Sequence, residues 1–124
     1  KKLKNIFYSH KIDYMQKNFI TTATDFIYRF ASALELSDAH VQLCYAVTQK
    51  AIELDVVEFN TPPSVASGCI MMVTKVLALP VTKKEISRVC NISEVTVGKC
   101  YKNLQKHSAV LFHPDDIKKF NLKL

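Results

Sequence analysis

Residues 63–79 are apolar on nearly every face of a helix, and this segment constrains the fold more than any other. A threonine and two prolines occupy positions 61–63, where threonine can cap a helix and proline suits the first helical position. The two apolar stripes comprise Val65, Cys69, Met72, Val76 and Leu79, and Ala66, Ile70, Val73 and Leu77. A helix that is apolar on most sides is buried on most sides. The sequence therefore predicts a central helix with the other elements packed around it.

Glycine is the residue whose scarcity narrows the fold class. Only Gly68 and Gly98 occur among 124 residues, whereas all-β folds use glycine in their turns. Apolar residues make up 48% of the chain, which at this length suits one domain with a core that needs no disulfide or metal. We therefore expect an all-α domain. The longest apolar stretch, 70–79, contains Thr74 and Lys75 and is too short to span a membrane, so we expect no membrane partner.

Capping signals divide the rest of the chain into helices. Thr22 stands three residues before Asp25, a spacing that resembles a capping box and predicts a helix start at Thr22. Ser37 is the predicted N-cap of the next helix, and Pro80 ends the central one. Beyond residue 107 the helical pattern dissolves, which predicts a loosely packed C-terminal tail over 108–124.

Two further caps outline a helix-turn-helix over 82–106. Thr82 and Glu85 form a capping box that opens a short helix ending near Cys90. A turn of about three residues follows, and Ser93 caps a second helix. Its inner face carries Val97, Cys100, Tyr101 and Leu104. In such motifs the second helix lies in the major groove of DNA, with its N-terminal residues towards the base edges.

The distribution of charge favours a polyanionic partner for this motif. The net charge of +6 divides into +4 over residues 1–18, −3 over 19–79, +4 over 80–106 and +1 over the remainder. Candidate DNA-binding residues are Ser93, Val95, Thr96, Gly98, Lys99 and Lys102 on the second helix, and Lys83, Lys84 and Arg88 on the first. Valine and threonine methyl groups suit thymine, lysine suits guanine or phosphate, and the free N–H groups of a first helical turn suit a phosphate. A merely solvated charged face is the alternative interpretation.

Catalytic and metal-binding signals are absent from the sequence pattern. His10, His40, His107 and His113 share no metal-ligand spacing, and no CxxC motif occurs. The cysteines, Cys44, Cys69, Cys90 and Cys100, each fall within an apolar helical pattern, which predicts buried thiols in a reducing compartment. His113 with Asp115 and Asp116 is the one cluster of histidine and carboxylates, and we interpret it as part of a solvated tail. We therefore expect no enzyme, no cofactor and no metal.

Six segments together resemble a known family. They are residues 24–30 (TDFIYRF), 50–57 (KAIELDVV), 63–70 (PSVASGCI), 82–86 (TKKEI), 93–97 (SEVTV) and 101–104 (YKNL). In order and spacing they resemble the second cyclin-like repeat of transcription factor IIB and its archaeal counterparts, from about Phe19 to Pro114. The resemblance implies a five-helix cyclin fold over 19–107, with residues 1–18 as a linker or helix between two repeats. It also implies that the chain is one repeat of a longer factor.

The resemblance carries functional expectations as well. It implies a general transcription initiation factor that binds the TATA-binding protein and promoter DNA upstream of the TATA box, and that reaches RNA polymerase through family parts missing from these 124 residues. By position, Val95 and Thr96 would meet bases, whereas the family's base-reading arginine falls at Gly98, so we expect weaker or altered sequence preference. We expect a monomer in the nucleus, or in a cytoplasmic viral factory if the source is a large DNA virus. The alternative function is an adaptor, because cyclin folds also bind kinases and activator peptides.

Overall fold

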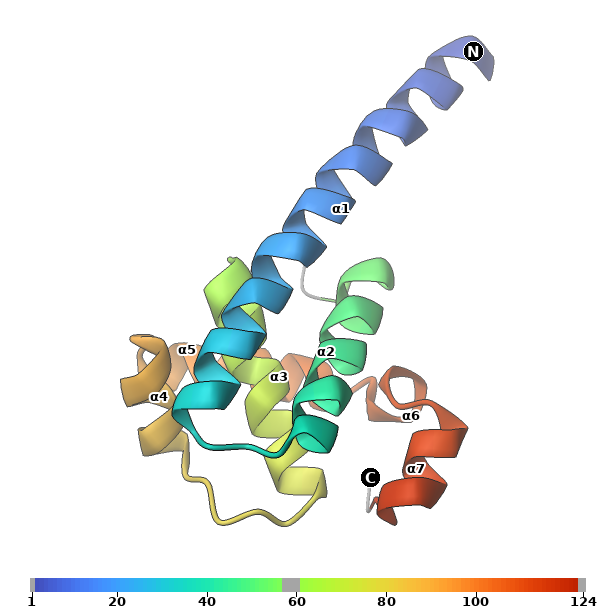
Figure 1. The fold of residues 1–124 in the computed structure, drawn as a ribbon. Coiled ribbons are helices and arrows are strands. Elements are labelled where there is room, and N and C mark those ends of the chain that lie inside the picture. The colour runs from blue at the N-terminus through green and yellow to red at the C-terminus, as the bar shows by residue number, and fades with distance from the viewer. Residues whose placement is uncertain (1, 57–60, 123–124) are drawn as a thin grey trace.

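The computed structural model describes residues 2–56 and 61–122, with side chains described from residue 18 onward, and all regular elements in these ranges are helices. They are α1 (Lys2–Ala33), α2 (Asp38–Glu53), α3 (Pro62–Val76), α4 (Lys83–Cys90), α5 (Glu94–Gln105), α6 (Ser108–Leu111) and α7 (Pro114–Phe120). The predicted all-α fold class is confirmed. Helices α1 to α5 form the five-helix unit that the sequence predicts, and α6 and α7 follow it (Figure 1).

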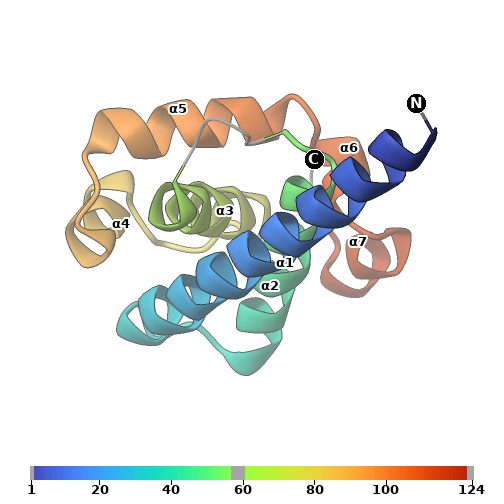
Figure 2. The ribbon, with the colours of Figure 1, turned by 90° about the horizontal axis from the view of Figure 1, so that it is seen from above.

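Helix α3 is the centre of the bundle. Every residue from Ser64 to Thr74 is buried, as the two apolar stripes predict. Figure 2 shows α3 between α5 on one side and α1 with α2 on the other, and α3 contacts all of these and α4 as well. The helix ends at Val76, three residues before the predicted end, because Ala78 takes a left-handed conformation with φ of 56°. Thr61 stands at the N-cap position, and its hydroxyl lies 2.9 Å from the Ser64 hydroxyl rather than bonding to the backbone.

Helix α1 is longer than the sequence predicts and has no break at Thr22. The Thr22 hydroxyl donates to the Asn18 carbonyl at 2.9 Å, and the Thr24 hydroxyl donates to the Ile20 carbonyl at 2.8 Å. Both are bonds of a threonine within a helix, so the predicted helix start at Thr22 is wrong. The helix also runs through the boundary predicted at 18/19, and its N-terminal part extends beyond the rest of the molecule (Figure 1). Lys1 lies outside the described residues.

Five helices end in the left-handed conformation without using glycine. The residues with positive φ are Glu35, Asp55, Ala78, Asn91 and Asn121, with φ between 52° and 60°. The residue after each of them donates its backbone N–H to a carbonyl five positions earlier, at 2.9–3.1 Å, as in a Schellman motif. These following residues are Leu36, Val56, Leu79, Ile92 and Leu122, all apolar. A left-handed helix C-terminus, which most often uses glycine, therefore occurs repeatedly in a chain that has only two glycines.

The C-terminal segment packs more closely than its sequence pattern predicts. Leu111 and Phe112 are 3% and 2% exposed and belong to the same buried cluster as Leu43 and Val47 of α2. Helices α6 and α7 have four and seven residues, which is too short for a helical period to be recognised in sequence. The segment predicted as a tail forms two short helices, of which the second ends at Phe120, and residues 123–124 lie outside the described part.

Candidate nucleic-acid interface

Two capped helices form the helix-turn-helix, with the boundaries that the sequence predicts. Helix α4 ends at Cys90 and α5 begins at Glu94, which leaves a turn of three residues. The backbone N–H of Glu85 donates to the Thr82 hydroxyl at 3.1 Å, and that hydroxyl donates to the Glu85 carboxylate at 3.2 Å. The N–H of Thr96 donates to the Ser93 hydroxyl at 3.2 Å. Both predicted caps are therefore confirmed, and they determine where each helix begins.

The turn between the two helices is held by hydrogen bonds to α4. Asn91 takes the left-handed conformation, with φ of 55°. The N–H of Ile92 donates to the Ser87 carbonyl at 3.1 Å, and the Ser87 hydroxyl donates back to the Ile92 carbonyl at 2.5 Å. This reciprocal pair fixes the direction in which the chain leaves α4 and hence the orientation of α5.

The buried faces of α4 and α5 determine which residues point outwards. The buried side chains are Ile86 and Cys90 on α4, and Val97, Cys100 and Leu104 on α5. Tyr101, which the sequence assigns to the inner face, is half-buried and lies under the Lys75 ammonium, 5.5 Å from its ring centroid. The inner stripe thus agrees with the prediction, and the residues between its members face solvent.

The predicted DNA-binding residues lie on the outer side of the motif. Val95 is 65% exposed, although large apolar side chains are usually buried. The cations Lys83, Lys84, Arg88, Lys99 and Lys102 are exposed, as is Ser93, whereas Thr96 and Gly98 are half-buried. The structure brings Lys83 to Gly98, because a Cβ built on Gly98 would lie 3.5 Å from the Lys83 ammonium nitrogen. The Ser93 hydroxyl donates to the Thr96 hydroxyl at 2.9 Å, so these two side chains bind each other in the free protein.

The cations of this outer side have no carboxylate partner among the described side chains. Among those side chains the one basic nitrogen within 4 Å of a carboxylate belongs to His113, whose Nδ1 lies 3.6 Å from Oδ2 of Asp115. These five exposed cations are therefore available to bind an anion without first breaking a salt bridge. Glu94 stands in the first turn of α5, where a carboxylate interacts favourably with the helix dipole.

The four cysteine thiols are buried in the helical bundle. Burial raises the pKa of the Cys44 and Cys90 thiols to about 12 and that of Cys100 to about 11. Burial likewise raises the pKa of Cys69 far above its usual range, against the lowering effect of a hydrogen bond with Thr48. All four are free and buried, as predicted. A thiol that stays protonated at neutral pH is a poor nucleophile and a poor metal ligand.

His113 caps a helix rather than marking a reactive cluster. Its Nδ1 accepts a hydrogen bond from the Asp115 backbone N–H at 3.1 Å, at the start of α7. Among the described side chains, those of residues 18–56 and 61–122, no group of three or more potential metal ligands comes together. In the same ranges, no helix combines the length and the apolar character that crossing a bilayer requires.

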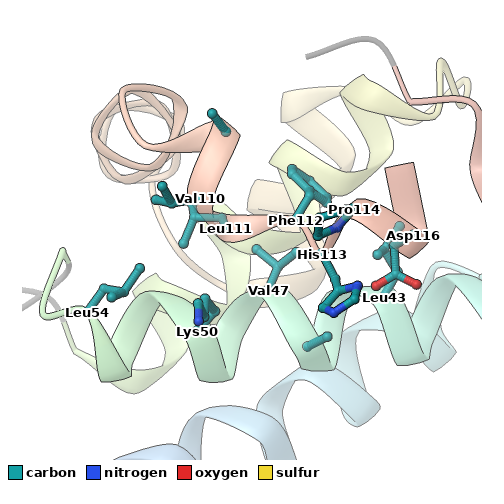
Figure 3. Close-up of a pocket in the computed structure, with 12 residues that line it drawn as sticks. Leu43, Val47, Lys50, Leu54, Val110, Leu111, Phe112, His113, Pro114 and Asp116 are labelled. Atoms are coloured by element: carbon teal, nitrogen blue, oxygen red, sulfur yellow. The ribbon is translucent and has the colours of Figure 1, made fainter. Parts of the chain in front are cut away.

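A groove at the other end of the molecule was not predictable from the helical pattern of the sequence. It lies between α2 and the α6–α7 segment and has a volume of about 580 Å³. Figure 3 shows Val47 and Lys50 of α2 on one wall and Val110 and Leu111 of α6 on the other. Leu54 and Val110 are 44% and 53% exposed there. The signal that could have indicated it is the apolar run 109–112, which the sequence analysis interpreted as a tail.

The fold and the outer face define a class: a helix-turn-helix protein built on a cyclin-like bundle. The family model described as the transcription factor TFIIB repeat matches residues 16–107. The chain therefore belongs to the transcription factor IIB repeat family.

Individual relatives agree with this assignment. Transcription initiation factor IIB of Drosophila virilis is 35% identical over 99 residues, which cover 80% of this chain and 33% of the relative. The Drosophila melanogaster factor is also 35% identical, and the human factor is 33% identical; each alignment covers 80% of this chain and 31% of the relative. The chain thus spans about a third of the length of the curated relatives it matches.

Proposed function

We propose that this chain is the promoter-binding module of a general transcription initiation factor. It binds double-stranded DNA upstream of the TATA box, together with the TATA-binding protein, and acts without catalysis. In the cell it works in the nucleus as a monomer, and other parts of the factor contact RNA polymerase. The family assignment supports this role because the relatives are named as transcription initiation factors.

The observation that carries the proposal is the outer face of α5. An exposed Val95 stands in its first turn, and two exposed lysines without an ion pair, Lys99 and Lys102, follow on the same side. An apolar side chain beside cations matches the floor and walls of the major groove, which offer thymine methyl groups and phosphate oxygens. The cations of α4 lie beside this face and add phosphate contacts.

A gel-shift assay across a salt series tests the proposal. Promoter duplexes that vary upstream of a TATA element are titrated with the chain, with and without the TATA-binding protein. Neutralising about four to six phosphates predicts a log–log salt slope of about −4 to −5. The variant Lys99→Glu/Lys102→Glu should reduce the magnitude of that slope by about 2 and weaken binding to every duplex.

The variant Lys118→Glu/Lys119→Glu is the matched control, because it makes the same charge change on α7 at the other end of the molecule. It should leave specific binding in place. If the two variants behave alike, or if binding does not respond to salt, the proposed interface is wrong. Capture of a kinase or an activator peptide without any DNA binding would favour the adaptor function instead.

A further inference from the structure

The outer face of α5 has a gap in its middle. One side of α5 carries Val95 together with Gly98, Lys99 and Lys102, because these three follow Val95 by three, four and seven residues. Gly98 contributes no side chain at the centre of this stripe. A glycine within a helix costs about 1 kcal/mol relative to alanine, so some gain elsewhere should offset it.

The backbone at Gly98 does not need glycine. Its φ is not positive, so the conformation is open to any residue. An added Cβ would meet only the side chain of Lys83, at 3.5 Å from Nζ and 3.9 Å from Cδ. A Cβ alone fits at these distances, but a longer side chain would occupy the space that the lysine fills.

Lys83 reaches this gap from the first residue of α4, so the end of its exposed side chain lies beside Gly98 of α5. No carboxylate among the described side chains pairs with it. Its ammonium therefore stands beside the exposed stripe, between the first-turn Val95 and the lysines further along.

We propose that Lys83 is the specificity-determining cation of this interface, and that Gly98 leaves room for it. The inference rests on the proposed function, in which α5 enters the major groove. A cation on the groove-facing side of the second helix meets base edges, and lysine there donates to O6 and N7 of guanine. Lys84, its neighbour on α4, contacts phosphate.

A selection from duplexes randomised upstream of a TATA element tests this, with the chain and the TATA-binding protein present. The wild-type chain should enrich guanine at one position. Lys83→Met should reduce that preference roughly ten-fold while keeping preferences at other positions. Lys83→Arg should retain it, because arginine also donates to guanine. Gly98→Leu should abolish it with Lys83 intact, since the leucine side chain takes the place of the ammonium.

Two comparisons separate the possible outcomes. Lys84→Met should weaken all duplexes by a similar factor, and Lys118→Met should change neither affinity nor preference. If Lys83→Met also weakens all duplexes evenly, or has no effect, Lys83 is not a base-reading residue although the proposed function stands. If the wild-type chain binds no duplex in a salt-dependent way, the proposed function fails and this inference fails with it.

Discussion

Gly68 lies where α3 and α5 cross, and a side chain there has no room. A Cβ would lie 2.5 Å from Sγ and 2.8 Å from Cβ of Cys100, and 3.3 Å from its backbone carbonyl carbon. Those distances are shorter than atoms in a packed core approach one another, so an added methyl group would force the helices apart. Among the described helices, no other pair is in more extensive contact than α3 and α5. The absence of a side chain at position 68 is what allows the two helices to approach this closely.

We expect Gly68→Ala to lower the free energy of unfolding by about 1–3 kcal/mol, because overpacking outweighs the gain in helix propensity. Urea unfolding measures the change. The same substitution in a Cys100→Gly background should cost at least about 1 kcal/mol less, since the two closest atoms are gone. Equal costs in both backgrounds would show that the contact with Cys100 is not the cause.

At the scale of the secondary-structure element, the helix C-termini are unusual because none of their left-handed residues is glycine. An L-residue in the left-handed conformation costs about 1–2 kcal/mol relative to a right-handed one, and glycine avoids this cost. Glu35 and Ala78 lack the short polar side chain by which asparagine and aspartate favour that conformation. Leu36 and Val56, which follow Glu35 and Asp55, pack against the buried cluster, and this packing offsets the local cost at those two helix ends.

Ala78→Gly should therefore raise the free energy of unfolding by about 0.5–1 kcal/mol. Ala46→Gly provides the comparison, because Ala46 is an exposed alanine within α2 and has an ordinary helical backbone. It should lower the free energy of unfolding by about 1 kcal/mol. Thermal or urea unfolding of the two variants should thus give shifts of opposite sign, and destabilisation by both would contradict the strain at Ala78.

Helix starts were predictable from this sequence, and helix ends were less so. Ser37, Thr82 and Ser93 were recognised because a short hydroxyl side chain preceded an apolar period, and each accepts the expected backbone bond. Thr22 and Asp25 have the three-residue spacing of a capping box, yet the Thr22 hydroxyl donates to the Asn18 carbonyl within a continuous helix. No glycine marked the end of α3, so its length was overestimated.

The outer face of α5 could be predicted from the apolar inner stripe, because the residues opposite that stripe on a helix must face away from the core. The contact between Lys83 and Gly98 did not, because it depends on how α4 and α5 cross and not on the period of either helix. The groove beside α6 was missed for a similar reason, as four residues carry too little pattern to predict an element.

For the whole molecule, the C-terminal segment is part of the cooperative core. Figure 2 shows α4 at one end of the bundle and the α6–α7 segment at the other. Phe112 and Leu111 are buried with residues of α2, and Leu122 at 8% exposed belongs to the same cluster. The segment should therefore unfold together with the five helices rather than before them.

Phe112→Ala should lower the free energy of unfolding by about 3–5 kcal/mol, because it leaves a cavity in this core. Val110→Ala, two residues away at a side chain 53% exposed, should change it by less than about 0.5 kcal/mol. Urea unfolding followed by circular dichroism gives both values and should show one transition. A small effect of Phe112→Ala, or a separate early transition, would show that the segment is an independent tail.

The crossing of α3 and α5 also has an evolutionary consequence. Positions 68 and 100 share one small volume, so neither can gain atoms unless the other loses them or α5 moves. A substitution that changes the combined volume of these two residues would move α5, and with it the exposed residues Val95, Lys99 and Lys102, relative to Lys83 on α4. Selection on the surface of the motif would then act on two buried residues that no ligand ever meets, and related chains should inherit them as a pair.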